Sequence, residues 1–555
     1  MRPKLLIVML VLLAFQASPG TAQSFGKPMI MPVGVPAGPA GWLFGQAYGN
    51  TPGAYNFGDE WYRAGQGLHF GIDLSMPCGT PLVAVADGVV GFVDDLGFGA
   101  GPHNLILRHD ALNVTTLYGH LNGRAPVSPG QTVTQGELVG YSGDPDSTCF
   151  SRPHLHFEVR SMDYQATYNP VDWIDANWHA LALVGAYSGS LFQGDMDNPT
   201  RWMSLDDQPD VRFFGARLND YSLVYPPPSG QNAPSSALPD RDLAPLDPGA
   251  AWSQRTIGSA RCCWQNFWHP SDPGALYSID APPEQRAQVV GWSLDVPRLD
   301  QPFESAPPTQ KSPDWAWRIT LSGDNALLTR VADGVEFSYN TGGRLPAFST
   351  DNSRLLWVDT RPTVPGQPRA AANIVVAELG SGLIRTVFSA PGANAQWLDG
   401  ARLLVTLPSE ERVTTYSVID TRDDRRFIMG MWSWSRGVNV GPGGKWVLLY
   451  ATNQPDPANS GVYALRTEEG AQPVKLDWFG SWRWRDSDEL YVIPMDVSQP
   501  SHTLLHVDLS TGAQTQLNTP QFTVMNGDWS VNADGTRIAY RDLSTVELTL
   551  MELGG

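Results

Sequence analysis

The chain has 555 residues and a formal net charge of −19 at pH 7. This length exceeds what one hydrophobic core usually serves, so we expect two or three domains. The acidic balance argues against nucleic-acid binding, which depends on basic groups that neutralise phosphates.

The first 22 residues have the pattern of a signal peptide. Arg2 and Lys4 precede an apolar run over residues 5–15, and Gly20 and Ala22 stand at the −3 and −1 positions of a cleavage site. The run is too short to span a bilayer. We therefore expect an exported protein that is extracellular, periplasmic or cell-wall associated, with no membrane span after signal cleavage. A short membrane anchor is the alternative.

Three segments of the Gly-rich region that follows combine histidine with glycine and apolar residues. GLHFGID has His69 and Asp73 four residues apart, LYGHL contains His120, and PHLHFE contains His154 and His156. Alternate residues of a strand point to the same face, so His154 and His156 are predicted to face the same way.

Histidine and aspartate in these segments are suitable ligands for a hydrolytic zinc site. Such a site uses three protein ligands and leaves a fourth position for water. Zinc lowers the pKa of that water and polarises the carbonyl under attack. Further side chains must manage the protons and the oxyanion. His-x-His alone is a weak signal, but the three segments together predict a zinc-dependent hydrolase.

The segments resemble the lysostaphin-type (LytM-like) zinc endopeptidases, which cut the peptide bridges of bacterial peptidoglycan. That family shows H-x-G-x-D, a GTPV-x-A-like turn and strand, Y-x-H-L and H-L-H-F-E; the matches here are HFGID, GTPLVA, YGHL and HLHFE. The resemblance runs from about Gln66 to Arg160, under a fifth of the chain. It implies an antiparallel-sheet peptidase domain that binds one Zn²⁺ per chain.

Carried over residue by residue, the resemblance assigns roles to five residues of the three segments. It implies that His69, Asp73 and His156 are the zinc ligands. It also implies that His120 and His154 are the catalytic pair, which orients or deprotonates the water and hydrogen-bonds the oxyanion.

The approach to the HLHFE strand departs from the family pattern. GDPDSTCFSRPHLH stands where the family has G-x-S-T-G-P-H-L-H, and it adds Cys149. The four cysteines allow three pairings, and export permits disulfides. We favour Cys78 with Cys149, because both flank the proposed site; the adjacent Cys262 and Cys263 would need a strained bridge. A Cys78–Cys149 bridge would tie this loop to the one after Asp73, so substrate choice is where this chain should differ from the family.

Other polar residues are weaker candidates for a role in the site. Glu158 shares the alternation of His156 and either supports the site or packs within the strand. Six further histidines have no partners in the sequence and are expected to be structural or solvated: His103, His109, His179, His269, His502 and His506.

From about residue 250 onward the chain is β-rich and repeats one pattern seven times: an apolar entry, a polar turn and an apolar strand, as in WSVNADGTRIAY. Periods in the forties with tight turns favour four-stranded β-propeller blades, and the repeats resemble TolB or WD40-like propellers. Six or seven blades are expected, and a β-sandwich is the alternative. The turn markers lie 51, 27, 48, 44, 43 and 48 residues apart: Gly274, Asn325, Asn352, Gly400, Gly444, Ser487 and Gly535.

These interpretations give a mostly β chain with four parts: a signal peptide (1–22), a LytM-like zinc peptidase domain (23–175), a bridging segment and Pro-rich linker (176–249), and a β-propeller (250–555). The expected function is that of an exported zinc metallo-endopeptidase. It would hydrolyse peptide bonds in peptidoglycan cross-links or stem peptides through a zinc-activated water, while the propeller binds a protein or glycan for targeting. The alternatives are a non-hydrolytic cell-wall-binding or regulatory protein and a protease for secreted proteins.

Overall fold

The computed structural model describes residues 26–554, apart from 52, 55–57, 59, 185–203, 219–237, 259–265, 281–287, 295–301, 304–310, 361–370 and 410–412. The predicted signal peptide and the pair Cys262 and Cys263 lie outside the described residues. Within these ranges, no helix has both the length and the apolar character needed to cross a membrane.

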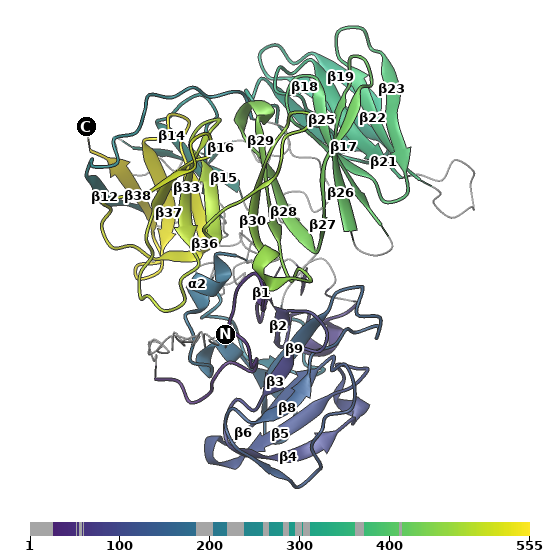
Figure 1. Ribbon diagram of the computed structural model, residues 1–555, viewed down its shortest axis with the longest axis vertical. Helices are drawn as coiled ribbons and strands as arrows, with labels where there is room; N and C mark the ends of the chain where they lie inside the picture. The colour runs from purple at the N-terminus through teal and green to yellow at the C-terminus, as the bar shows by residue number, and fades with distance from the viewer. Residues whose placement is uncertain are drawn as a thin grey trace, which may run out of the picture.

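The described chain forms two β-rich bodies, one above the other in Figure 1. The lower body is built on a nine-stranded antiparallel sheet whose main path runs β1-β2-β9-β6-β5-β4-β7. Its strands are β1 (Leu43–Gln46), β2 (Ile72–Ser75), β4 (Gly88–Val93), β5 (Leu105–His109), β6 (Val114–Gly119), β7 (Thr132–Val133), β9 (His154–Ser161), β10 (Ala166–Tyr168) and β11 (Val211–Arg212).

A few short elements complete the lower body. Strands β3 (Pro81–Val83) and β8 (Leu138–Tyr141) form a two-stranded sheet. Four 3₁₀ helices cover Arg63–Gly65, Leu96–Phe98, Asp110–Leu112 and Pro170–Asp172, and the α-helix α2 covers Trp178–Ala182. Strand β11 pairs with β10, so the sheet takes its last strand from the segment that sequence analysis assigns to the bridge.

Strand β9 lies inside the sheet, between β2 and β6. Leu155, Phe157 and Val159 are fully buried in the core of the lower body. The intervening residues, which include His154 and His156, face the other side, where they meet Asp73 of β2. The predicted shared face of the two histidines is therefore confirmed.

The upper body is a seven-bladed β-propeller, which confirms the predicted fold class and sets the blade number at seven. Its first four sheets in chain order are β13–β16 (Asn266–Trp268, Ala275–Asp280, Gln288–Ser293, Pro302–Phe303), β17–β19 (Trp317–Ser322, Asn325–Arg330, Glu336–Asn340), β20–β23 (Ala347–Phe348, Arg354–Asp359, Ala372–Glu378, Ile384–Ala390) and β24–β27 (Asn394–Trp397, Arg402–Pro408, Val413–Asp420, Arg426–Ser433).

The remaining three sheets are β28–β31 (Ser435–Val440, Trp446–Ala451, Gly461–Arg466, Val474–Lys475), β32–β35 (Gly480–Trp484, Glu489–Pro494, Leu505–Asp508, Ala513–Gln516), and β36–β38 (Val524–Val531, Arg537–Asp542, Leu548–Leu553) joined by β12 (Trp252–Gly258). Two more 3₁₀ helices cover Pro442–Gly444 and Pro457–Asn459.

Each of the seven turn markers belongs to a different blade. In each blade, the marker lies in or at the edge of the hairpin that joins the two innermost strands. The 27-residue spacing from Asn325 to Asn352 spans the sheet β17–β19, which has three described strands where the others have four. A shorter blade therefore accounts for the shorter spacing.

The last blade closes the ring with strands from both ends of the propeller. Strand β12 pairs antiparallel with β38 from Trp252 opposite Leu553 to Gly258 opposite Leu548. This pairing gives the blade its outer strand and leaves no open seam between the first and last sheets, since an unpaired edge would expose its backbone polar groups.

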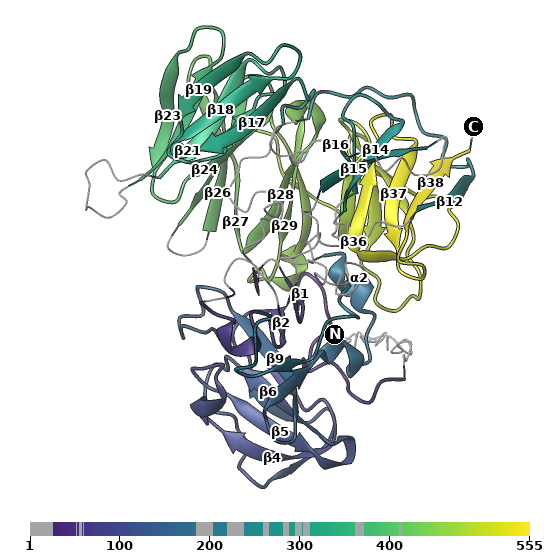
Figure 2. The ribbon, with the colours of Figure 1, turned by 180° about the vertical axis from the view of Figure 1, so that it is seen from behind.

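The two bodies pack on each other through β1 and α2, which lie between them in both views (Figures 1 and 2). Leu43 and Leu183 of the lower body belong to the same buried cluster as propeller tryptophans. The Asn177 Nδ2 donates a hydrogen bond of 2.7 Å to the Gln499 carbonyl. The propeller is therefore held against the lower body by both apolar and polar contacts.

Candidate metal centre

A cavity of about 1060 Å³ lies at the junction of the two bodies. Strands β2 and β9 and the loops around them form one wall, which contains all five predicted site residues: His69, Asp73, His120, His154 and His156. The other wall comes from six propeller residues: Pro408, Ser409, Thr414, Trp434, Ser435 and Arg436. The structure thus brings the five residues together although up to 87 positions separate them in the sequence.

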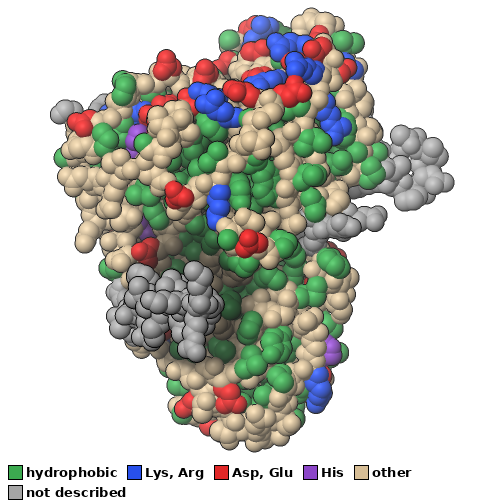
Figure 3. All heavy atoms as spheres, in the orientation of Figure 1, with side chains coloured by type: hydrophobic (Ala, Val, Ile, Leu, Met, Phe, Trp, Pro, Cys, Tyr) green, Lys and Arg blue, Asp and Glu red, His purple; other side chains and the backbone are tan. Residues whose placement is uncertain are grey.

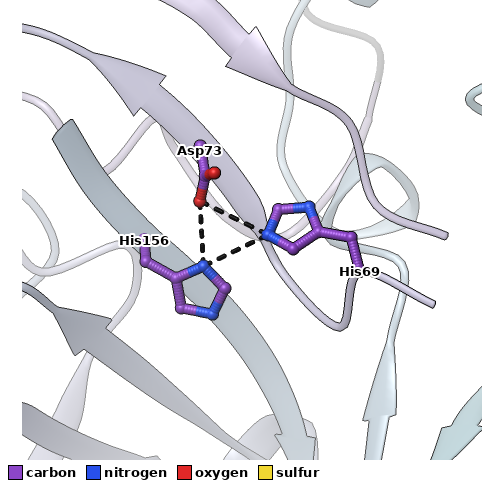
Figure 4. A group of neighbouring side chains, drawn as sticks. All are labelled: His69, Asp73 and His156. Atoms are coloured by element: carbon purple, nitrogen blue, oxygen red, sulfur yellow. Dashed lines mark hydrogen bonds and ion pairs between the residues drawn. The ribbon is translucent and has the colours of Figure 1, made fainter. Parts of the chain in front are cut away.

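Three of these side chains point their donor atoms at one place (Figure 4). The Asp73 Oδ1 lies 2.9 Å from the His156 Nδ1 and 3.4 Å from the His69 Nε2, and the two nitrogens are 3.3 Å apart. Ligands about 2.0–2.1 Å from a tetrahedral zinc ion stand about 3.3 Å from one another. The spacing of the three donors therefore fits one zinc ion.

The glycine of HFGID is required by the packing of this centre. A Cβ on Gly71 would lie 2.7 Å from both the His156 Cε1 and the Phe157 carbonyl oxygen, closer than real Cβ atoms approach. Any larger residue would push β2 and β9 apart and separate Asp73 from His156.

The outer nitrogen of each ligand histidine has a fixed partner. The His69 Nδ1 donates to the Ala47 carbonyl at 2.7 Å, which leaves Nε2 as a lone-pair donor toward the centre. The His156 Nε2 lies 3.1 Å from Glu158 Oε1, and Arg160 Nε donates to Glu158 Oε2 at 2.6 Å. Partners of this kind orient metal-binding imidazoles and raise their basicity.

Glu158 is therefore a supporting residue of the centre, one of the two roles that strand alternation left open. Burial opposes its ionisation, but the Arg160 guanidinium and His156 outweigh burial and lower the Glu158 pKa to about 2. Arg160 gave no signal in the sequence, where it reads as an ordinary charge at the end of a strand.

In the absence of metal, the charged side chains around the centre favour a cation at this position. Burial disfavours ionised Asp73, but His69, His154 and the hydrogen bond with His156 outweigh it and hold the Asp73 pKa well below its usual value. Burial likewise disfavours protonated His156, but its hydrogen bonds with Asp73 and Glu158 raise the His156 pKa to about 9. Without metal, a proton on His156 supplies positive charge between the two carboxylates.

His120 and His154 stand beside this centre with their ring centroids 4.8 Å apart. The His120 Nδ1 donates to the Gly101 carbonyl, and the His154 Nδ1 donates to the Arg152 carbonyl at 2.6 Å. With its hydrogen on Nδ1, each ring when uncharged has Nε2 as an acceptor. Burial, followed by the nearby His154 and His156, lowers the His120 pKa to about 3, so that this ring is uncharged at neutral pH.

The loop before β9 is tied to the loop after β2 by the Cys78–Cys149 disulfide, so the favoured pairing is confirmed. Asp144 organises the same loop: its carboxylate accepts hydrogen bonds from the Ser151 hydroxyl at 2.6 Å and the Ser151 N–H at 2.9 Å. The segment that departs from the lysostaphin-type pattern therefore forms part of the cavity wall.

Four of the remaining histidines hold structural contacts away from the cavity. The rings of His103, His179 and His506 pair with Asp94, Asp206 and Glu489 at 2.7–3.0 Å. His109 lies between the Asp87 carbonyl and the Thr116 hydroxyl. These contacts agree with the structural role expected of them.

Comparisons with known proteins place the same segment among peptidases. Residues 67–171 match the model of peptidase family M23. Over 93 residues the chain is 39% identical to the DD-carboxypeptidase/endopeptidase Mpg of Neisseria meningitidis serogroup B, which covers 17% of this chain and 20% of that protein. Over 200 residues it is 26% identical to lysostaphin of Staphylococcus staphylolyticus, 36% of each chain.

A solved structure matches the same domain. The catalytic domain of lysostaphin from Staphylococcus simulans is 25% identical, with 23% of this chain and 90% of that chain covered and a TM-score of 0.20. The family model and the two curated relatives confirm the lysostaphin-type resemblance of the segment that holds the centre. The chain spans 20% and 36% of the two curated relatives, so the activity of the whole protein is a matter for proposal.

Proposed function

With an M23-type peptidase domain at residues 67–171 as the premise, we propose that this protein is an exported zinc metallo-endopeptidase that hydrolyses peptide bonds of bacterial peptidoglycan. The observation that carries the proposal is the convergence of three donor atoms, 2.9–3.4 Å apart, beside two more histidines that face the same cavity. The relatives named as lysostaphin and as a DD-carboxypeptidase/endopeptidase support the substrate class.

His69, Asp73 and His156 would hold the zinc ion. Bound there, zinc supplies Lewis-acid polarisation of the scissile carbonyl and activation of the attacking water. Glu158 and Arg160 keep the His156 ring in place, because the carboxylate contacts the ring nitrogen that faces away from the centre.

His120 and His154 handle the protons. The neutral His120 accepts a hydrogen bond from the attacking water at Nε2, which aims the oxygen at the substrate carbonyl. The His154 Nε2 takes the proton that the water loses, and protonated His154 then donates it to the leaving amine. Both rings keep their orientation throughout, because each Nδ1–H keeps donating its hydrogen bond to a backbone carbonyl.

Zinc content and hydrolysis, measured on the same variants, test the proposal. The full chain should carry about one zinc and release peptides from purified peptidoglycan, with the cut bond identified by mass spectrometry of defined muropeptides. Asp73→Ala and His156→Ala should lose the metal. His120→Ala and His154→Ala should keep zinc but lower kcat by about 10²-fold or more, the usual contribution of a positioned acid–base group.

His103→Ala provides the matched control, because this histidine pairs with Asp94 and does not line the cavity. It should retain both zinc and activity. Stoichiometric zinc without cleavage of any wall peptide would favour the non-hydrolytic wall-binding role instead. Undiminished turnover in the double variant of His120 and His154 would contradict the roles given to them.

A further inference from the structure

The propeller forms part of the wall of the candidate active-site cavity. Six of its residues line the cavity opposite the metal centre: Pro408, Ser409, Thr414, Trp434, Ser435 and Arg436. They come from the end of β25, the start of β26 and the start of β28, on two neighbouring blades. A substrate in the cavity therefore lies against the propeller as well as the peptidase domain.

This second wall is held at a fixed place relative to the centre. Beside the blade that carries Arg436, the Asn453 N–H donates to the Pro39 carbonyl at 2.7 Å. Across the same junction, the Asn526 N–H donates to His179 Nδ1 at 3.3 Å, and Met525 packs into the core of the peptidase domain. The propeller is therefore anchored to the lower body through two of its blades.

Arg436 reaches from this wall to the strand that carries Asp73. Its Nη1 donates to the Ser75 hydroxyl at 3.4 Å. Asp73 and Ser75 are two residues apart on β2 and share the face toward the cavity, so the guanidinium lies about 7 Å along the strand from the centre. An extended peptide spans that distance with two residues.

The guanidinium has no anionic partner within the described part of the chain. Its contact with Ser75 is with a neutral group, and no described carboxylate forms an ion pair with it. Burial lowers the Arg436 pKa, since the cation is partly removed from water without a counter-charge. Partly buried charges are ordinarily paired, so a cation left in this state is suited to receive an anion from a ligand.

The charge of the cavity contrasts with that of the molecule. Acidic and basic side chains are interspersed over the outer end of the propeller in Figure 3, and the whole chain carries −19. The described residues that line the cavity include one carboxylate, Asp73, and two guanidinium groups, Arg152 and Arg436. Arg152 lies over the Trp61 ring at 4.6 Å. When Asp73 binds a metal, the remaining charged side chains of the described lining are the two arginines, so the net charge of these side chains is positive.

We propose that Arg436 of the propeller binds a carboxylate of the substrate peptide within two residues of the bond that is cut, so that the protein selects wall peptides with free carboxylates. This inference rests on the proposed function and adds a specificity-determining residue to it. The planar guanidinium suits a carboxylate because it can donate two parallel hydrogen bonds. Peptides whose carboxylates are amidated would leave the cation unpaired.

The test compares one synthetic wall stem peptide with free carboxylates and the same peptide with those carboxylates converted to carboxamides. The wild-type full chain should show a kcat/KM about 10-fold or more higher for the carboxylate form, because a charge-assisted hydrogen bond is lost with the carboxamide. Arg436→Gln should abolish this preference through KM and leave kcat/KM for the carboxamide form unchanged. Arg436→Lys, which keeps the charge without the fork, should retain part of the preference.

Arg425→Gln is the matched control, because Arg425 is an exposed propeller arginine that pairs with Glu469 and does not line the cavity. It should behave as wild type. Thermal unfolding of Arg436→Gln should match that of wild type. A carboxylate preference that survives in Arg436→Gln, or an equal loss on both peptides, would overturn the inference.

Binding of the two peptides to the zinc-free protein separates this inference from the proposed hydrolysis. If the wild type cleaves neither peptide but binds the carboxylate form more tightly, and Arg436→Gln loses that difference, hydrolysis fails and the inference stands. If the wild type binds both forms equally, the inference fails whether or not either peptide is cleaved.

Discussion

His156 stands between two carboxylates, and this position decides how the centre competes for protons. Asp73 lies 2.9 Å from its Nδ1 and Glu158 lies 3.1 Å from its Nε2. In the metal-free protein these contacts raise the His156 pKa to about 9, so the ring is charged at neutral pH. A metal ion can bind Nδ1 only after that proton leaves.

Zinc affinity should therefore rise with pH, by up to about tenfold per unit, and level off near pH 9. The sign follows from the raised pKa: below 9 the metal displaces a proton, and above 9 no proton remains to be displaced. Competition against a chelator of known pH dependence measures the affinity. A flat affinity between pH 7 and 9 would contradict the account.

Glu158→Gln provides a matched variant for the same measurement. Glutamine preserves the shape of the side chain but removes one of the two charges that stabilise protonated His156. The affinity curve should then level off at a lower pH than in wild type. An unchanged curve would mean that Asp73 alone sets the His156 pKa.

Much of this residue-scale picture could be predicted, because the motif spacing identifies the histidines and Asp73. The roles of Glu158 and Arg160 could not, because they depend on side-chain contacts along β9 that alternation alone leaves open. Arg436 could not be predicted either, since no sequence pattern relates a propeller strand to β2, 361 residues away.

Among the elements, the loop before β9 depends on the Cys78–Cys149 disulfide for its place in the cavity wall. The bridge closes a separation of 71 residues. The double variant Cys78→Ser, Cys149→Ser should retain zinc, because none of the ligands moves with the loop. It should raise KM for wall peptides, and it should lower the free energy of unfolding of the peptidase domain by up to about 4 kcal/mol, from the chain entropy of a loop of that length.

Calorimetry and peptide kinetics on the double variant measure these effects. The variant is preferable to treating wild type with a reductant, because the substitutions change only the Cys78–Cys149 pair. Reductant added to the double variant should change neither its melting temperature nor its KM. Loss of zinc from the double variant would contradict the assignment of the bridge to the loop alone.

The sequence predicts a propeller of six or seven blades, because each blade repeats one apolar–turn–apolar pattern at a similar spacing. The turn residues are polar and the strands are apolar, as in β21, whose Leu355, Leu356 and Trp357 are buried. The three-stranded sheet β17–β19 left the blade number open, because its short spacing breaks the period.

In the whole molecule, the ring is closed by the pairing of β12 with β38. Removal of residues 547–555 would take away β38, expose the edges of β12 and β37, and release buried side chains such as Leu550 and Met551. The shortened protein should unfold at a lower temperature, retain zinc, and lose kcat/KM for wall peptides because the second wall of the cavity is no longer supported. Removal of Gly554 and Gly555 alone is the control. Thermal unfolding and catalysis equal to wild type would contradict this view of the closure.

The closure of the propeller also bears on the order in which the parts of the proposed site are synthesised. The five proposed site residues are all synthesised by residue 156, whereas the strand that completes the ring is made from residue 548 onward. The ribosome therefore makes the site residues nearly four hundred residues before it makes the strand that closes the propeller. Under the proposed function, the nascent chain would contain the residues for hydrolysis before the propeller that completes the substrate-selecting wall of the cavity, so selectivity would follow hydrolysis in the order of synthesis.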